Sequence, residues 1–204
     1  GLGGSAASAV AAVKAASVWT PTPIHTDQKL HYASLGEAIS SGTTAHFDNI
    51  APALLEELIL VTPHNQSTIR VLPCPKGLTF IIWHPNIQIH TSASRQQLKK
   101  DIPLKLHIKQ SGFLASSICD LYAGNMRSWA RQLQDLIIEP QRKEAIPNYD
   151  QAKNIAIQEG ALCFGISGSG PSCFAICDKQ SAASITKKVS NAFTAKVNTW
   201  EYTF

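Results

Sequence analysis

Residues 1–8 read Gly-Leu-Gly-Gly-Ser-Ala-Ala-Ser, and an Ala- and Val-rich segment with helical character follows at once. Glycines let the backbone turn tightly and come close to a ligand. The first turn of a helix presents unpaired N–H groups and the positive end of the helix dipole. This combination is typical of a phosphate-binding site. The loop alone is equally consistent with an Ala-rich core helix that Ser5 caps after a flexible start.

The glycine loop matches neither of the two common nucleotide-binding patterns. The Walker pattern requires Lys-Ser or Lys-Thr after its second glycine, and the dinucleotide pattern requires a further glycine that is absent after Ser5-Ala6. The loop also begins at the first residue of the chain, without an initiator Met or an upstream strand to position it. We therefore expect the chain to be a fragment of a longer protein.

The composition is that of an ordinary globular protein. With 204 residues, of which 44% are hydrophobic and 16% charged, the chain can form one large domain or two small ones. The longest strongly apolar run, 78–83, is far too short to span a bilayer, so we expect no membrane partner. The five cysteines are odd in number and include no Cys-x-x-Cys, which favours reduced thiols in a cytoplasmic protein.

The charged residues give a mild basic excess, with a formal net charge of +4. The densest basic stretch contains Lys99, Lys100, Lys105 and Lys109, and the one aromatic residue near it is Phe113. Nucleic-acid surfaces interleave aromatic residues with the charges. We therefore interpret this stretch as solvated surface and expect no nucleic-acid partner. The sequence leaves a homodimer open.

Periodicity and turn residues predict a mixed α+β chain. The expected helices span residues 5–18, 27–40, 53–58, 94–100, 114–136, 149–159 and 181–195. The expected strands span residues 58–62, 68–72, 78–83, 163–167, 172–177 and 199–204. The second helix has a plausible apolar stripe of Leu30, Leu35, Ala38 and Ile39. A polar turn over 46–52 precedes the third helix.

The segment Pro73-Cys74-Pro75-Lys76-Gly77 is the best candidate for a domain boundary, because prolines and glycine interrupt regular structure there. We predict one domain at residues 1–75 and a second at residues 76–204. From residue 78 onward the order is roughly strand, helices, strand, strand, helix, strand. This order is that of a split βαβ, ferredoxin-like fold.

A second glycine-rich loop spans residues 165–172, with the sequence Gly-Ile-Ser-Gly-Ser-Gly-Pro-Ser. Alone, the loop is more typical of a β-hairpin turn with glycines at positive φ. The presence of two such loops in one chain shifts the interpretation toward nucleotide binding.

The motifs together resemble those of the GHMP kinases, the superfamily of galactokinase, homoserine kinase, mevalonate kinase and phosphomevalonate kinase. Residues 1–8 resemble the second motif of the superfamily, its phosphate loop, and residues 165–172 resemble its third, glycine-rich motif. The run His-Phe-Asp-Asn-Ile-Ala-Pro at 46–52 resembles the His-x-Asp-Asn-x-Ala-Pro of homoserine kinases, and 139–142 resembles their Glu-Pro-x-Arg. Residues 83–86, Trp-His-Pro-Asn, resemble the strand end that leads to their substrate loop.

This resemblance implies an α+β, two-domain fold in which an incomplete N-terminal ATP-binding domain precedes a ferredoxin-like C-terminal kinase domain. The N-terminal domain is incomplete because the first motif of the superfamily is absent from the sequence. The resemblance implies ATP-dependent phosphorylation of the side-chain hydroxyl of L-homoserine, on the cytoplasmic route to threonine, with Mg²⁺ as cofactor. Without the first motif, we expect the isolated chain to be inactive.

The resemblance also assigns roles to individual residues. The ATP-binding residues are Gly1, Leu2, Gly3, Gly4, Ser5, Ala6, Ala7, Ser8, Gly168, Ser169 and Gly170. The Mg²⁺ ligands are Ser5 and Glu37. The catalytic residues Asp48 and Asn49 hold the substrate, and the amino-acid pocket is completed by His46, Thr91, Arg95 and Arg142. These residue types suit phosphoryl transfer, which mainly requires positioning and charge neutralisation, and an arginine fork suits a carboxylate.

Several of these residues also have purely structural alternatives. Glu37 could be a surface charge on its helix, and Asp48 could cap the helix that follows it. Arg95 and Arg142 could pair with nearby carboxylates at the surface. For function, the alternatives are another GHMP kinase that acts on mevalonate or a sugar, and a non-catalytic ligand-binding relative. Whether Asp48 acts as a general base or only positions the substrate is left open.

Overall fold

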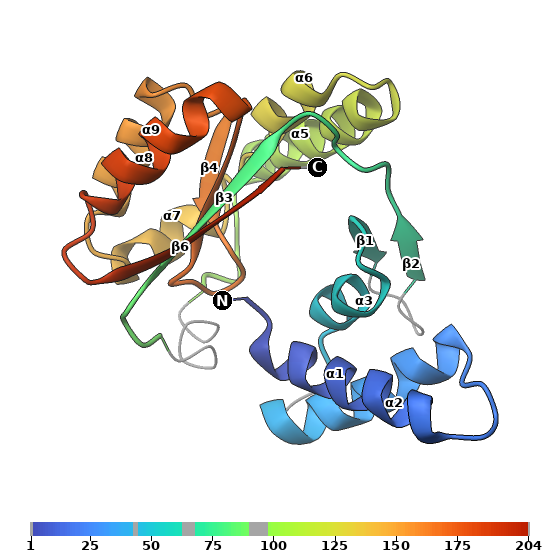
Figure 1. Cartoon of the computed structure of the whole chain (residues 1–204). Coiled ribbons are helices and arrows are strands. Elements are labelled where there is room, and N and C mark those ends of the chain that lie inside the picture. Colours follow the sequence, from blue (N-terminus) through green and yellow to red (C-terminus); the bar gives the residue numbers. More distant parts are fainter. Residues whose placement is uncertain (1, 43–44, 63–67, 90–97, 204) are drawn as a thin grey trace. The chain divides into compact units, whose positions relative to one another are not determined.

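The computed structural model describes the chain except for residues 1, 43–44, 63–67, 90–97 and 204 (Figure 1). The described residues form two compact units, Leu2–Cys74 and Pro75–Phe204. Each unit has a hydrophobic core of its own. Within the described ranges, every helix is too short or too polar to span a lipid bilayer.

The first unit consists of three helices and a small β-hairpin. Helices α1 (Gly4–Trp19) and α2 (Thr26–Ser41) lie within one residue of the predicted bounds. Helix α3 (Phe47–Leu55) is followed by strands β1 (Ile59–Thr62) and β2 (Thr68–Val71), which pair antiparallel. Both strands confirm the sequence prediction.

Small residues allow the helices of the first unit to pack closely. Ala6 of α1 and Ala33 of α2 are fully buried. A Cβ placed on Gly36 would lie 3.4 Å from the Cβ of Ala9, so there is no room for a larger residue without adjustment. The core is completed by larger side chains from α1 and α3, namely Val10, Ile50 and Leu54.

Two sequence predictions for this unit are wrong. Leu35 and Ile39 do not belong to the buried face of α2, since they are 51% and 85% exposed. The buried face instead carries Ala33 and Glu37, one turn apart. The polar turn predicted at 46–52 is largely helical, because α3 begins at Phe47 and tolerates a proline in its interior.

The second unit is built on a four-stranded antiparallel sheet with the order β4-β5-β3-β6. Its strands are β3 (Thr79–Pro85), β4 (Cys163–Ile166), β5 (Cys173–Cys177) and β6 (Val197–Thr203). The strand that comes first in the chain lies between the third and the fourth. This is the ferredoxin-like arrangement that the order of predicted elements indicated.

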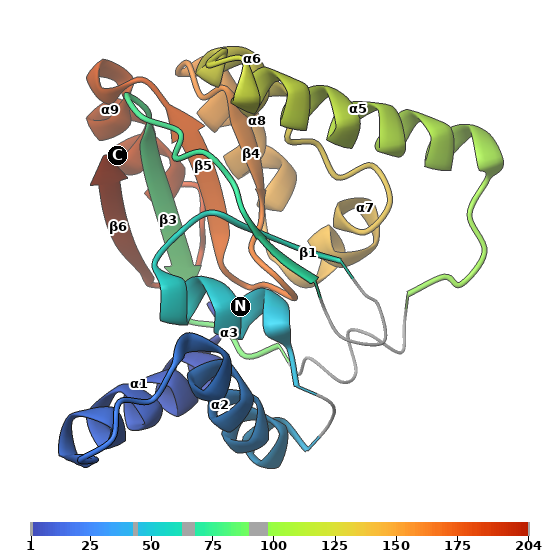
Figure 2. The same cartoon turned by 90° about the vertical axis from the view of Figure 1, so that its right-hand side faces the viewer.

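One face of this sheet is covered by α8 (Tyr149–Gln158) and α9 (Lys179–Ser190), as Figures 1 and 2 show. Strand β3 has a strict alternation of burial, and its Ile81 and Trp83 are fully buried in the core with the two helices. Cross-strand register places Cys173 opposite Trp83. The three buried cysteines of the sheet are free thiols.

The remaining helices differ from the sequence prediction in their bounds. The single helix expected at 114–136 is two helices, α5 (Leu104–Tyr122) and α6 (Met126–Gln132), which Gly124 separates with a φ of 78°. The predicted helix at 94–100 falls mostly outside the described residues, and 98–100 is not helical.

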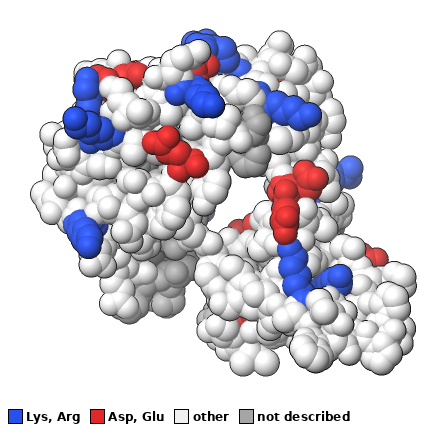
Figure 3. All heavy atoms as spheres, in the orientation of Figure 1, with Lys and Arg blue, Asp and Glu red and all other residues white. Residues whose placement is uncertain are grey.

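The sequence prediction missed the short helix α7 (Glu139–Arg142) and the 3₁₀ turn η1 (Lys143–Ala145). Four residues carry too little helical periodicity to be recognised in a sequence. The Lys, Arg, Asp and Glu side chains visible in Figure 3 stand singly or in small mixed groups among uncharged residues.

Candidate active site

The N-terminus of α1 has the geometry of an anion-binding helix end. Gly3 is the N-cap residue, with φ 66° in the left-handed region, and no side chain caps the helix. The first helical hydrogen bond runs from the Ala7 N–H to the Gly3 carbonyl, at 2.9 Å. The N–H groups of Gly4, Ser5 and Ala6 therefore precede the helical hydrogen-bond ladder. Ser5 lies inside the helix, so it is not the cap of the structural alternative.

Ser5 instead takes part in a cluster with two residues that are distant in the sequence. Its Oγ donates to Oε1 of Glu37, 3.2 Å away on α2. Oε2 of the same carboxylate accepts the His46 N–H at 3.0 Å, and the His46 Nδ1 lies 2.9 Å from Oε1. The structure thus brings together Ser5 and Glu37, which the resemblance nominated as metal ligands, and His46, which it nominated for the substrate pocket.

The carboxylate of Glu37 is a buried group rather than a surface charge, with 1% of the residue exposed. Burial raises the pKa of Glu37, but the hydrogen bonds from His46 and Ser5 lower it, and the net pKa lies below the ordinary value. An ionised carboxylate only accepts hydrogen bonds, so the proton between the two side chains belongs to His46 Nδ1. The opposite ring nitrogen, Nε2, is buried and has no hydrogen-bond partner among the described residues.

Gly3 and Asn49 also meet in this unit. A Cβ on Gly3 would lie 3.1 Å from Asn49 Oδ1 and 3.2 Å from Asn49 Cβ, which is too close for most side chains. The backbone at position 3 also has a positive φ, which residues other than glycine rarely adopt. Glycine at position 3 therefore lets the Asn49 side chain approach the start of α1. Asp48 is exposed in the first turn of α3, where its charge suits the helix dipole, but its side chain does not cap the helix.

In the second unit, the loop between β4 and β5 is a tight hairpin turn. The Ser167 N–H donates to the Ser172 carbonyl at 2.8 Å, and the Gly170 N–H donates to the Ser167 carbonyl at 3.0 Å. Gly168 and Gly170 have φ values of 57° and 80°. These glycines therefore supply the positive φ angles that the hairpin turn needs. The turn conformation is also compatible with a role in ligand binding.

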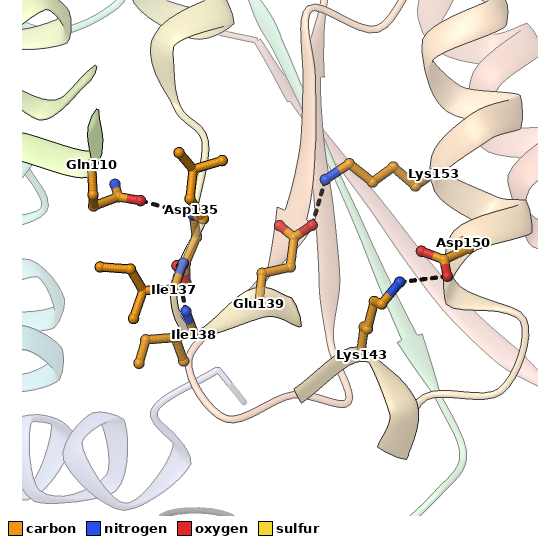
Figure 4. Close-up of polar contacts among 9 residues, drawn as sticks. Gln110, Asp135, Ile137, Ile138, Glu139, Lys143, Asp150 and Lys153 are labelled. Carbon is orange, nitrogen blue, oxygen red and sulfur yellow. Dashed lines mark hydrogen bonds and ion pairs between the residues drawn. The ribbon is translucent and has the colours of Figure 1, made fainter. Parts of the chain in front are cut away.

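Arg142 contacts this loop directly. Its Nη1 donates to the Gly168 carbonyl at 2.5 Å, from the C-terminal end of α7. At the other end of the same short helix, Glu139 forms an ion pair with Lys153 of α8 (Figure 4). Lys153 was not nominated from the sequence, because nothing in the sequence marks Glu139 as a buried carboxylate in need of a cation.

Two family models match the sequence. The model of the N-terminal domain of GHMP kinases matches residues 1–57, and the model of their C-terminal region matches residues 117–195. The chain belongs to the GHMP kinase family. The matched residues include the α1 terminus in one unit and the β4–β5 loop in the other.

Several curated relatives of this GHMP kinase chain are named homoserine kinase. The protein of Chlorobaculum tepidum is 36% identical over 194 residues, which cover 95% of this chain and 60% of the relative. The protein of Xanthomonas campestris is 38% identical over 183 residues, which cover 90% of this chain and 56% of the relative. The chain thus spans about 60% of the length of the Chlorobaculum protein.

Solved structures of GHMP kinases have a similar fold. The homoserine kinase of Cytophaga hutchinsonii superposes with a TM-score of 0.90 at 33% identity, covering 97% of this chain and 64% of that one. The mevalonate kinase of L. major, solved with R-mevalonate, superposes with a TM-score of 0.78 at 17% identity, covering 98% of this chain and 65% of that one. The second match demonstrates the shared fold only.

Some nominated residues of this GHMP kinase chain lie outside the described ranges, namely Gly1, Thr91 and Arg95. No cluster of three or more His, Cys, Asp or Glu side chains that could hold a metal occurs in the part of the chain that the structure describes. The Ser5 and Glu37 oxygens nevertheless suit Mg²⁺, which is bound in phosphoryl-transfer sites by one or two protein oxygens together with phosphate and water.

Proposed function

We propose that the chain carries the larger part of a homoserine kinase, which transfers the γ-phosphoryl group of ATP to the side-chain hydroxyl of L-homoserine. The observation that carries the proposal is the cluster of Ser5, Glu37 and His46 at the uncapped start of α1. The identity of the acceptor is supported by the names of the relatives at 33–38% identity. The unit Leu2–Cys74 would belong to an ATP-binding domain at residues 1–75, and the second unit to a kinase domain at 76–204.

The start of α1 would bind the phosphates of ATP. The N–H groups of residues 4–6 stand before the first helical hydrogen bond, and the helix dipole adds positive potential. Gly3 keeps the backbone open to close approach. The loop residues Gly168, Ser169 and Gly170 are proposed as ATP-binding residues on the resemblance of their motif.

Ser5 and Glu37 would hold Mg²⁺. Their oxygens are 3.2 Å apart, close to the separation of adjacent ligands around an octahedral ion with ligand distances of about 2.1 Å. When bound, Mg²⁺ supplies charge that stabilises the phosphoryl group during transfer. The His46 ring bonds the same Oε1 that faces Ser5, and the His46 backbone N–H bonds Oε2, so His46 would orient the Glu37 carboxylate toward the ion.

Asp48 and Asn49 would hold homoserine beside the phosphoryl group. Asn49 packs on Gly3, so its amide stands at the start of the phosphate-binding helix. Asp48 is exposed and ionisable, and it would orient the homoserine hydroxyl. His46 would offer its unpartnered Nε2 as a hydrogen-bond acceptor to the substrate.

Recognition of the amino-acid carboxylate would fall to arginine. Arg142 sits at the edge of the β4–β5 loop, where its fork suits a bidentate contact. Thr91 and Arg95 are proposed for the same pocket on the resemblance alone. As an ATP-dependent step on the route to threonine, the reaction would take place in the cytoplasm.

The test is an ATP-consumption assay with the longest natural protein that carries this sequence. We expect turnover of L-homoserine with Mg-ATP, formation of O-phosphohomoserine identified by mass spectrometry, and loss of activity with EDTA. Mevalonate, galactose and L-serine serve as competing acceptors in parallel reactions. Robust turnover of mevalonate or galactose with none of homoserine would overturn the proposal.

A further inference from the structure

The position of α7 must be set by its surroundings. The helix is a single turn, and Pro140 within it has no backbone N–H to donate. A helix of four residues is not stable by its own hydrogen bonds. Four residues before the helix lies Asp135, whose Oδ1 accepts the N–H groups of Ile137 and Ile138 at 3.0 and 2.7 Å (Figure 4). These bonds fix the entry to α7.

A second support for the entry comes from α5. The side chain of Gln110 accepts the Leu136 N–H at 2.8 Å and donates to the Gln134 carbonyl at 2.9 Å. Its amide thus binds the backbone in the way that a neighbouring strand would. These contacts hold the segment before α7, but they reach neither end of the helix itself.

The helix is fixed to the body of the unit by Glu139. This residue is 8% exposed, and its carboxylate pairs with Lys153 on α8 (Figure 4). The other carboxylate oxygen lies 3.5 Å from the position that a Cβ on Gly165 would occupy. Glu139 therefore packs directly on β4, the strand that leads into the glycine loop. The buried hydroxyl of Tyr149 lies nearby, and burial together with the charge of Glu139 raises the pKa of Tyr149.

The opposite end of α7 holds the loop itself. Arg142, three residues after Glu139, donates to the Gly168 carbonyl at 2.5 Å. The single turn therefore connects two points of the same hairpin, the end of β4 and the loop that follows. Because Glu139 and Arg142 are the first and last residues of this single turn, a displacement of the helix at Glu139 also shifts the Arg142 backbone.

We propose that Glu139 is a positioning residue: its ion pair with Lys153 fixes α7, and thereby places the Arg142 guanidinium on the glycine loop. Glu139 contacts no substrate and acts through Arg142. The effect on homoserine binding rests on the proposed function, whereas the effect on the loop does not. The negative charge matters because a neutral amide of the same shape can accept a hydrogen bond from Lys153 but cannot form an ion pair with it.

The first experiment measures steady-state kinetics of Glu139→Gln in the longest natural protein that carries this sequence, which is the unmodified protein of every comparison below. We expect KM for homoserine to rise about tenfold, because small displacements of a binding group reduce rates strongly, while KM for ATP changes less. In an Arg142→Ala background, Glu139→Gln should change KM for homoserine by less than about twofold, since residues that act through one another are not additive. A merely structural role would lower the active fraction in both backgrounds.

The matched control is Glu159→Gln. Glu159 also pairs with a lysine, Lys188, in the same unit, but at its surface and away from α7. We expect this variant to leave both KM values within about twofold of the unmodified protein. If Glu139→Gln does not fold, Lys153→Gln removes the same pair from its half-exposed side, and we expect a rise of KM for homoserine in the same direction.

The second experiment does not depend on any substrate. Amide hydrogen exchange of the peptide that covers residues 166–173 reports the Gly170 and Ser167 hydrogen bonds directly. We expect exchange in Glu139→Gln to be several-fold faster than in the unmodified protein and in Glu159→Gln. Unchanged exchange would overturn the proposal, and so would faster exchange with an unchanged KM for homoserine. Absence of homoserine turnover in the unmodified protein would refute the proposed function alone.

Discussion

Two glutamates of this chain bury their carboxylates almost completely, and they are stabilised in different ways. Glu37 is surrounded by a serine hydroxyl, a backbone N–H and an imidazole. Glu139 is matched by the ammonium group of Lys153. The first carboxylate keeps its charge through hydrogen bonds, and the second through a full opposite charge.

The difference indicates what each carboxylate can do. A carboxylate held by hydrogen bonds can exchange one donor for a cation, so Glu37 suits a site where a metal ion binds and leaves. A carboxylate paired with a fixed lysine has its charge already neutralised, so Glu139 suits a permanent structural contact.

The largest effect is expected for Glu37→Gln. The amide retains the size of the side chain but loses the negative charge that would hold Mg²⁺. We expect kcat to fall on the order of a hundredfold or more, which is the range for groups that stabilise transition-state charge. A Mg²⁺ titration of the rate should show a weaker apparent affinity.

Glu56→Gln is the control for this prediction. Glu56 pairs with Lys14 at the surface of the same unit, so its loss should leave kcat within about twofold. Equal rates for Glu37→Gln and the unmodified protein at saturating Mg²⁺ would remove Glu37 from the metal site.

The next effect is expected for Arg142→Ala. The proposed partner of its guanidinium is the homoserine carboxylate, and losing one member of a desolvated charge pair corresponds to roughly thirtyfold or more in affinity. We expect KM for homoserine to rise by that factor and KM for ATP to rise less. Arg127→Ala, which removes an exposed pair with Asp178, should leave both unchanged. An unaltered homoserine KM in Arg142→Ala would contradict the assignment.

A stability effect is expected for Lys153→Met. The substitution leaves the Glu139 carboxylate buried without its cation. We expect the free energy of unfolding to fall by about 1–2 kcal/mol. This loss is smaller than for a fully buried pair, because the Lys153 side chain is 37% exposed. Urea denaturation at neutral pH measures it. Adding Glu139→Gln should recover part of the loss, whereas Lys143→Met, at an exposed pair with Asp150, should be nearly neutral. A double variant less stable than Lys153→Met would show that the pair is not the cause.

The sequence predicted most of the regular fold. The ferredoxin-like arrangement of the second unit followed from the order of the predicted elements, and the continuous apolar run at 78–83 correctly indicated strand β3. It failed where a local signal opposed the tertiary packing. The residues up to Pro52 were interpreted as a turn before a helix at 53–58, whereas α3 begins at Phe47 and accommodates the proline in its interior.

The candidate site was predictable in its residue types but not in its contacts. The motifs nominated Ser5, Glu37 and His46, yet their hydrogen bonds join residues 9 to 32 positions apart, which only the packing of α1, α2 and α3 brings together. The burial of charged side chains could not be predicted from the sequence either. A glutamate on an amphipathic helix is usually solvated, so neither Glu37 nor the Glu139–Lys153 pair could be identified as buried from the sequence.

The smallest effect is expected for Glu159→Gln, which removes the exposed counterpart of the Glu139 pair. The bonds from Lys188 and Ser184 lower the pKa of Glu159 below its usual 4.5. A carboxyl with a lowered folded-state pKa contributes stability above the unfolded-state pKa, and loses it as the pH falls through the folded value. The melting temperature of the variant should therefore lie slightly below that of the unmodified protein at pH 7, by about 2 °C or less. As the pH falls from 4.5 through the folded-state pKa of Glu159, the two melting temperatures should converge. Differential scanning calorimetry at pH 7 and over this acidic range tests this, and a difference that grows on acidification would contradict the sign of the shift.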